Sequence, residues 1–405
     1  MTDVRDHLER WATDFNHADP AYNANAHAIW DELRDGGCPV AHSPRYGGMW
    51  APLTHQLVHE VAYDTEHFTS NGVIVSNARP GIAAPVGPAP PITSDPPFHQ
   101  IARRLLLPPF SPKSIDPWEP EVRRLCDDLI DRIGAVTPGT SVIDAAVQYA
   151  QSIPVNVIAR MLGFPPEDEE VFRGFVHNVI EQVDLPAEQR IANFQTLDAY
   201  IDRQIADHVA NPRDDLTSYL LDVELDGHRL AYEHVRGSIV LLLIAGIDTT
   251  WSAIGASLWH LATNAADLER LVDDPSVIMF AVEEFLRAYA PVTMARLVKD
   301  DYDFHGCPMK ADEWVLLPFP AANRDPAFFE RAGEFVIDRA ENRHAAFGLG
   351  IHRCIGSNLA RLEVRVAVEQ FVRRFPRFEL AGDVAWSQGQ IRGPRVLPVR
   401  VLASD

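Results

Sequence analysis

The sequence predicts a mainly α-helical protein with a small β part, organised as one large domain around a long central helix. Apolar residues recur at three- and four-residue spacing over 120–133, 266–290 and 355–375, the period of a helix with one buried face. Strand-like segments are short, as in "EWVLLPF" at 313–319 and "RVLPVRVL" at 395–402. No internal repeat and no Ser/Gly-rich linker divides the 405 residues, so we expect a single domain.

The composition excludes several classes of partner. The net charge is −21, with 57 acidic against 36 basic residues, which disfavours nucleic acid or an anionic membrane as a partner. The longest apolar run, "IVLLLIAGI" at 239–247, is shorter than the about 20 residues of a membrane span. The N-terminus has no apolar signal segment. The cysteines are scattered and typical of a reducing compartment, so we expect a cytoplasmic protein; they are Cys38, Cys126, Cys307 and Cys354.

Residues 71–94 are poor in acids and rich in Pro, Gly and Ala. A long segment without regular structure inside a domain is usually functional or disordered. Because this one is fairly apolar, we expect a lid over a substrate site. Arg79 within it either meets a substrate carboxylate or faces solvent, and we favour solvent.

The long helix predicted over about 233–263 carries polar residues in its middle. At ~1.5 Å per residue it would cross the whole molecule. The stretch "AGIDTT" at 245–250 places Asp248 and Thr249 in otherwise apolar sequence. A threonine there can simply bond back to the carbonyl four residues earlier. A buried aspartate is costly unless it has a use, so we expect a functional pair.

The segment "FGLGIHRCIG" at 347–356 places a cysteine where a helix begins. The helix dipole, free backbone N–H groups and Arg353 would stabilise a Cys354 thiolate. No second cysteine or histidine pair stands nearby at zinc-ligand spacing. A single axial thiolate is what a haem iron needs. The alternative for an isolated cysteine is a small buried hydrophobe.

The segment resembles the haem-binding signature of the cytochrome P450 family, F-x-x-G-x-R/H-x-C-x-G. The matching residues are Phe347, Gly350, His352, Cys354 and Gly356. The stretch at 245–249 is similar to the A/G-G-x-D/E-T motif of the same family, and matches run in order from residue 95 to 363. The resemblance implies one haem domain over 1–405, with haem b bound through the Cys354 thiolate, as in a soluble bacterial monooxygenase.

Further residues match by position. In "EEFLR", Glu284 and Arg287 have the family's E-x-x-R spacing, and Arg339 matches its third, basic partner. These three would brace the cysteine loop. In "DPPFHQIARR", we expect a helix capped by Asp95 and prolines. The residues implied to contact the haem are His99, Arg103, Arg296, Phe347, Gly348, His352 and Gly356.

The implied reaction inserts one atom of O2 into a small to medium apolar substrate, by hydroxylation or oxidative dealkylation. Thr249 would hydrogen-bond dioxygen, and Asp248 would feed protons. By analogy the pocket is mainly aliphatic, and its expected residues are Leu242, Ala245, Val292, Thr293 and Ile391.

We expect a monomer. Because no flavin or iron–sulfur segment follows the haem domain in the sequence, we expect electrons to come from a separate ferredoxin and reductase. We expect the ferredoxin to dock near Arg353, Arg361 and Arg365, unless these arginines pair elsewhere. Two alternatives remain. A peroxide-driven enzyme would lack the acid–alcohol pair, and a non-catalytic haem sensor would need neither that pair nor a lid.

Overall fold

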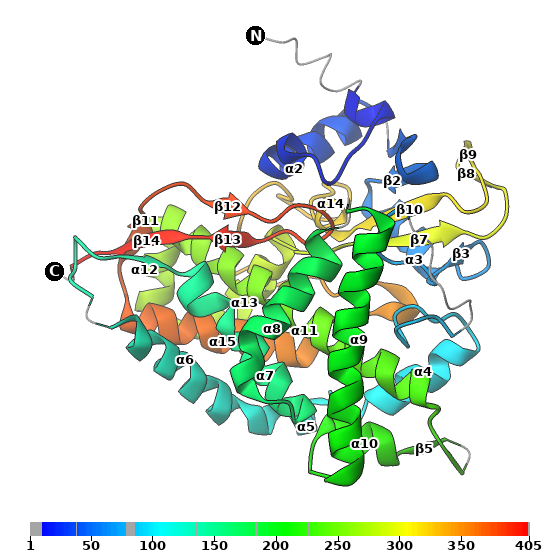
Figure 1. Ribbon diagram of the computed structural model, residues 1–405. Coiled ribbons are helices and arrows are strands. Elements are labelled where there is room, and N and C mark those ends of the chain that lie inside the picture. Colours follow the sequence, from blue (N-terminus) through cyan, green and yellow to red (C-terminus); the bar gives the residue numbers. More distant parts are fainter. Residues whose placement is uncertain are drawn as a thin grey trace.

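The computed structural model describes residues 10–37, 39–77, 86–134, 136–182, 185–225 and 227–403. Helices make up most of it and gather on one side, while the largest sheet lies on the other (Figure 1). The α-helices are α2 (Pro20–Asp35), α3 (His55–Tyr63), α4 (Phe98–Leu106), α5 (Pro112–Ile115), α6 (Glu119–Ile133), α7 (Ser152–Leu162), α8 (Glu169–Val176), α9 (Ala187–Ala210), α10 (Leu216–Asp222), α11 (Tyr232–Thr263), α12 (Ala265–Asp273), α13 (Ile278–Ala288), α14 (Phe319–Ala322) and α15 (Ser357–Arg374).

The β part consists of short strands in small sheets. A 5-stranded sheet has the order β1-β2-β10-β7-β3, a 3-stranded sheet has the order β11-β14-β4, and β12 pairs with β13. The strands are β1 (Val40–Ser43), β2 (Met49–Pro52), β3 (Phe68–Thr69), β4 (Val142–Asp144), β5 (Glu224–Leu225), β6 (His228–Arg229), β7 (Thr293–Val298), β8 (Tyr302–Phe304), β9 (Cys307–Met309), β10 (Trp314–Pro318), β11 (Phe378–Leu380), β12 (Ala385–Trp386), β13 (Pro394–Val396) and β14 (Pro398–Val401). The predicted fold class, mainly α with a small β part, is confirmed.

Helix α11 is the long central helix that the sequence predicts. It packs against α7, α15, α13 and β13, and most of its residues are buried. By length and composition it could span a membrane, but 72% of its most apolar window is buried inside the protein. Its apolar sequence is therefore accounted for by the protein core that it runs through.

Two predicted elements are divided in the structure. The helical pattern over 266–290 is interrupted at Pro275, where the Asp274 side chain accepts the N–H of Ser276 and starts a new turn. Proline lacks the N–H that a continuous helix would need there. The strand pattern over 395–402 likewise splits into β13 and β14. The two strands meet at Leu397 and belong to different sheets, since β13 pairs with β12 and β14 pairs with β4.

The cysteine loop lies where the helical and sheet parts of the core meet. Ala345 packs in the cluster beneath the 5-stranded sheet, and its neighbour Ala346 packs in the large helical cluster. The segment that follows is therefore anchored from both sides before it reaches Cys354.

Candidate active site

The loop before α15 holds Cys354 in a fixed turn. The Cys354 N–H donates to the carbonyl of Phe347 at 2.7 Å, which closes the loop. Gly348 and Gly350 have φ of +73° and +69°, a region that suits glycine. The helix begins at Ser357, just past the cysteine, as the sequence predicts.

The groups around the Cys354 sulfur shift the pKa of its thiol in opposite directions. Enclosure by the protein raises the pKa of the thiol, although part of the side chain remains accessible. The N–H of Gly356 and the positive charges of Arg103, Arg353 and Arg361 act in the opposite direction. Such a site keeps a thiolate best when a cation binds the sulfur directly.

The other residues predicted around the cofactor frame this loop. The Arg361 guanidinium lies 4.4 Å from the centre of the Phe347 ring, which fixes the half-buried ring by a cation–π contact. Gly348 lies beside Phe319, and Gly356 lies beside the Cys354 sulfur.

Four basic side chains face one another next to the loop: His99, Arg103, Arg296 and His352. The His99 and His352 rings are 4.3 Å apart. Burial, together with the neighbouring cations, lowers the pKa of His99 to about 4 and that of His352 to about 2. Burial also lowers the pKa of Arg296 to about 10. Asp95 is a nearby negative charge that acts in the opposite direction on His99 and Arg296, but more weakly than burial.

The partners of these four side chains are not carboxylates. Among the described residues none of them forms an ion pair, and both ring nitrogens of His99 are buried without a hydrogen bond. Arg296 donates to the carbonyl of Ala295 at 2.8 Å, and Arg103 donates to that of Arg353 at 2.6 Å. Buried polar groups are rarely left unpaired, so the cluster fits an anionic ligand such as a carboxylate.

Asp95 does not cap α4 as the sequence predicts. Its carboxylate accepts the Thr69 hydroxyl at 2.5 Å and the N–H of Ser70 at 2.9 Å instead. The α4 N-terminus has no side-chain cap and begins after Pro97. Ser70 in turn bonds His352 at 2.8 Å, so Asp95 supports the basic cluster indirectly.

The middle of α11 presents its small residues to accessible space. Ala245 is exposed and Thr249, one turn later, is partly exposed, although the residues between them include the buried Ile247 and Asp248. The Thr249 hydroxyl donates to the Ala245 carbonyl at 2.9 Å. The local back-bond that the sequence left open is therefore present, on an accessible face of the helix.

Asp248 has partners that the sequence analysis missed. Its side chain is fully buried and forms an ion pair with Arg395 at 2.5 Å, and Arg395 also binds Glu181 at 2.6 Å. Burial raises the pKa of Asp248 to about 6, while Arg395 acts in the opposite direction. Arg395 lies 147 residues further along the chain, in a segment with no motif, so no local signal marks it.

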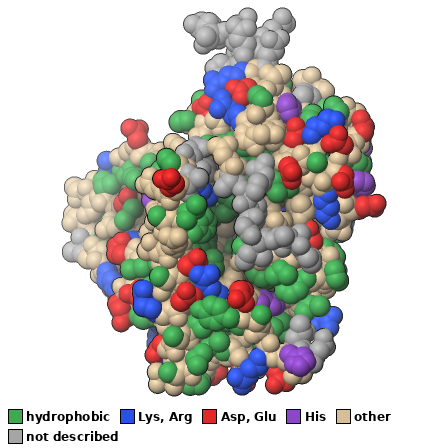
Figure 2. Space-filling view, turned by 45° about the vertical axis from the view of Figure 1, so that its right-hand side comes forward, with side chains coloured by type: hydrophobic (Ala, Val, Ile, Leu, Met, Phe, Trp, Pro, Cys, Tyr) green, Lys and Arg blue, Asp and Glu red, His purple; other side chains and the backbone are tan. Residues whose placement is uncertain are grey.

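The predicted pocket residues come together in part. Val292 and Ile391 form an isolated β-bridge, and the N–H of Thr293 donates to the Gln390 carbonyl at 2.8 Å. Val292 and Ala245 are accessible, whereas Leu242, Thr293 and Ile391 are buried. Figure 2 shows a recess near the middle of one face, with hydrophobic side chains along one side of it.

The predicted lid is described over 71–77 and 86–94, and it contains neither helix nor strand there. The Gln390 amide donates to the carbonyl of Val73 at 3.0 Å and accepts the N–H of Val75 at 2.5 Å. Gly237 of α11 lets Pro88 approach, since a Cβ would overlap the Pro88 carbonyl. Arg79 lies outside the described residues.

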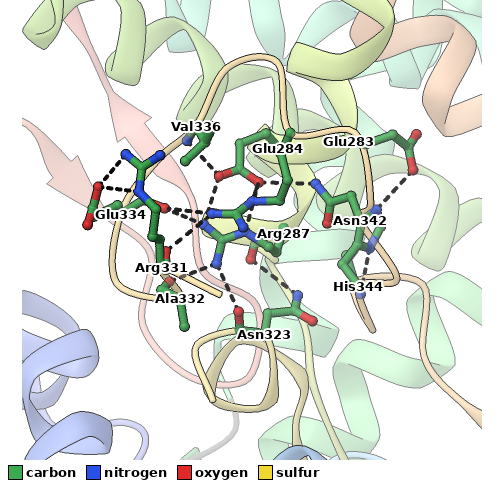
Figure 3. A network of polar contacts seen from close by, with 12 residues as sticks. Glu283, Glu284, Arg287, Asn323, Arg331, Ala332, Glu334, Val336, Asn342 and His344 are labelled. Atoms are coloured by element: carbon green, nitrogen blue, oxygen red, sulfur yellow. Dashed lines mark hydrogen bonds and ion pairs between the residues drawn. The ribbon is translucent and has the colours of Figure 1, made fainter. Parts of the chain in front are cut away.

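The predicted bracing triad forms a buried network (Figure 3). Glu284 accepts two bonds from Arg287 at 2.8 Å each and one from Arg339 at 3.0 Å. Arg287 also donates to the carbonyl of Asn323 at 2.9 Å, and the Asn323 side chain accepts the N–H of Ala345 at 2.7 Å. The network thereby reaches the start of the cysteine loop.

Two of the three arginines expected to bind a ferredoxin are paired within the chain. Arg361 binds Glu283 through two bonds of 2.6 and 2.9 Å, and Arg365 binds Glu119 at 2.5 Å. Arg353 is exposed and forms no ion pair among the described residues. The charge available for docking therefore differs from the sequence expectation, because nearby acids neutralise the first two arginines.

Comparisons with known proteins identify the family of the chain. The cytochrome P450 family model matches residues 277–385. The chain is 33% identical to cytochrome P450 107B1 of Saccharopolyspora erythraea, over 94% of this chain and 96% of that protein. It is 34% identical to the steroid C26-monooxygenase of Mycobacterium tuberculosis, over 83% of this chain and 89% of that protein.

A solved structure is similar over nearly the same length. The structure of CYP109E1 from Bacillus megaterium in complex with testosterone matches with a TM-score of 0.85 and 29% identity, over 95% of this chain and 99% of that one. Relatives at this identity, covered almost end to end, establish the relationship. The chain belongs to the cytochrome P450 family and is a monooxygenase of that family.

Proposed function

We propose that this cytochrome P450 binds haem b through the Cys354 thiolate and oxygenates a small to medium apolar substrate. The observation that carries the proposal is the group of His99, Arg103, Arg296 and His352 beside an accessible cysteine, since among the described residues none of the four forms an ion pair and both His99 ring nitrogens are buried without a hydrogen bond. A haem carries two carboxylates and an iron that takes one axial thiolate. When bound, it would supply the activation of O2.

The residues of the chain have separable roles in this proposal. The basic cluster holds the haem carboxylates by charge-assisted hydrogen bonds. Thr249 offers a hydroxyl on the accessible face of α11, and Asp248 supplies protons to that region. The apolar recess excludes water, which protects reactive species from side reactions.

The proposed substrate class rests on the residues expected to line the pocket and on the molecules named for similar proteins. Ala245, Val292 and Ile391 offer aliphatic contacts and no charge, so binding would rest on apolar area. One relative is a steroid C26-monooxygenase, and one similar structure holds testosterone. A steroid or a terpenoid of similar size is therefore the first substrate class to test, by the spin-state shift on binding.

The first experiment is the absorption spectrum of the reduced, carbon-monoxide-bound protein. A strongly red-shifted Soret band is expected, and Cys354→Ala should abolish it. The buried Cys126, changed to Ala, is the matched control and should leave the band in place. An unshifted band in the wild type, or no haem at all, would overturn the proposal.

Turnover separates the two alternative functions. With ferredoxin, reductase and NADH, a monooxygenase forms product, and Thr249→Ala should lower the product formed per NADH at least several-fold. A peroxide-driven enzyme would form product with peroxide alone at a higher rate. A haem sensor would form product under neither condition.

We further propose that a separate ferredoxin docks around Arg353. Arg343 is also exposed and forms no ion pair among the described residues. Arg353→Glu and Arg343→Glu should each slow reduction by ferredoxin, most strongly at low salt. Arg361→Glu is a poor test, since it would also break the pair with Glu283. Salt-independent, wild-type reduction rates in both variants would exclude this docking face.

A further inference from the structure

The carboxylate of Asp248 is held asymmetrically inside α11. Its Oδ1 accepts from Nη2 of Arg395 at 2.5 Å, whereas its Oδ2 is buried and has no hydrogen-bond partner among the residues that the structure describes. The side chain is 0% exposed. One oxygen is thus fixed and the other keeps its full capacity to accept and release a proton.

Arg395 is itself held from several directions. Its Nε donates to Glu181 at 2.6 Å and its Nη1 donates to the Ser252 hydroxyl at 3.1 Å. The guanidinium lies 4.1 Å from the centre of the Trp251 ring, a cation–π distance. A planar guanidinium with all three nitrogens engaged has one allowed orientation.

The backbone before Arg395 is pressed against the same turn of α11. A Cβ on Gly393 would overlap Ser252, and one on Gly255 would contact Pro394 at 3.3 Å. These close approaches bring β13 near enough for the Arg395 side chain to reach Asp248.

The contacts continue from Arg395 to the protein surface. Glu181, at the end of the π-helical turn His177–Glu181, accepts from Arg395 with Oε1 and bonds the His177 ring with Oε2 at 2.7 Å. His177 is 54% exposed. Asp248, Arg395, Glu181 and His177 therefore form one chain of polar contacts from the centre of α11 to solvent.

We propose that Arg395 is a positioning residue that holds Asp248 for proton delivery beside Thr249, and that the Glu181–His177 pair holds Arg395 in turn. The inference rests on the proposed function, because it assigns a role within the same site. Arg395 places a positive charge between the two carboxylates of Asp248 and Glu181. Its charge stabilises the carboxylate that Asp248 becomes when it releases a proton.

Removal of the Arg395 charge should keep Asp248 protonated at neutral pH. Burial already raises the pKa of Asp248, and Glu181 acts in the same direction, so loss of the opposing Arg395 charge raises it further. The groups facing Asp248 in this argument are Arg395, Glu181 and, through Glu181, His177. We expect the pH dependence of product formation to move to higher pH in Arg395→Met.

The test compares Arg395→Met and Arg395→Lys with Arg400→Met. Arg400 pairs with Glu379 in the neighbouring sheet and serves as the matched control. Product per NADH should fall about tenfold or more in Arg395→Met and less in Arg395→Lys. It should not change in Arg400→Met. Wild-type coupling in Arg395→Met would overturn the inference, whereas an inactive wild type would instead overturn the proposed function.

A double-mutant cycle distinguishes positioning from a structural role. If Arg395 acts through Asp248, then Asp248→Asn combined with Arg395→Met should be no worse than Asp248→Asn alone. Additive losses would contradict the assignment. The infrared carboxyl band of Asp248, identified by its loss in Asp248→Asn, gives a readout without turnover. It should grow at neutral pH in Arg395→Met, and an unchanged band would also contradict it.

Discussion

Gly350 brings the cysteine loop against α3 with no side chain between them. Its φ is +69°, and a Cβ would overlap the carbonyl oxygen of Ala62. Glycine is therefore needed at this position for two separate reasons, backbone conformation and close approach. The family signature contains this glycine, and the structure supplies a physical cause for it.

We predict that Gly350→Ala destabilises the protein and lowers its haem content. A positive φ costs alanine about 1 kcal/mol, and the overlap with a backbone oxygen adds ~1–3 kcal/mol. Gly306→Ala is the control, because Gly306 has φ of +85° but no atom within 4 Å of the position that a Cβ would take. Urea unfolding and haem content per protein measure both effects. Equal losses in the two variants would show that the contact with Ala62 is unimportant.

At the scale of elements, α13 and α15 are joined by Glu283. Its carboxylate binds Arg361 of α15 and the His344 ring at 3.1 Å. Burial opposes ionisation, but His344 and Arg361 outweigh it and lower the pKa of Glu283 to about 2. The helix that follows Cys354 is thus tied to the helix that carries Glu284.

We predict that Glu283→Gln lowers stability at neutral pH by about 1–2 kcal/mol. The folded-state pKa is depressed, so the contribution is complete above the ordinary pKa of 4.5 and is lost as pH falls towards 2. The stability difference between wild type and variant should therefore narrow in that range. Glu379→Gln, which breaks the more exposed pair with Arg400, should have a smaller effect. Urea unfolding from pH 7 to pH 3 measures the free energies of unfolding of wild type and variant. A difference between them that does not change with pH would contradict this role of Glu283.

The elements that carry the site were predictable where their cause is local. The turn at Cys354 depends on adjacent glycines, and one-turn spacing places Glu284 and Arg287 on one helix face. That this pair braces the loop is implied by the family resemblance and not by the spacing. The Pro275 break in 266–290 also has a local cause, but the apolar periodicity of that stretch does not reveal it.

The contacts that cross the fold were not predictable from the same sequence. Asp95 has the sequence position of a helix cap, yet its carboxylate accepts hydrogen bonds from Thr69 and Ser70 of another segment. Arg395 reaches Asp248 only because β13 packs against α11. Arg361 has the charge expected of a docking residue, but Glu283 of another helix neutralises it. Each depends on tertiary neighbours that no single-chain pattern specifies.

At the scale of the whole molecule, the charges divide into neutralised and unneutralised groups. The arginines along α15 are paired with acids of other elements, as in Arg373 with Asp127 and Arg374 with Asp131. The buried Arg296 forms no ion pair among the described residues, and Asp95 offsets only part of the cost of burying its charge. An uncompensated buried cation destabilises a fold, so the cluster ties the stability of the whole protein to an anionic ligand.

We predict that Arg296→Met has opposite effects on the protein with and without haem. In apoprotein it removes an uncompensated buried charge and should raise stability by ~1–3 kcal/mol. In holoprotein it removes a donor to a haem carboxylate, so haem transfer to apomyoglobin should become at least several-fold faster. Arg287→Met is the matched control, because Arg287 is equally buried but paired with Glu284. That change should destabilise both forms by ~3–5 kcal/mol, since it leaves Glu284 unpaired. Thermal unfolding of both forms measures the signs, and a loss of apoprotein stability in Arg296→Met would show that the cluster is balanced within the chain.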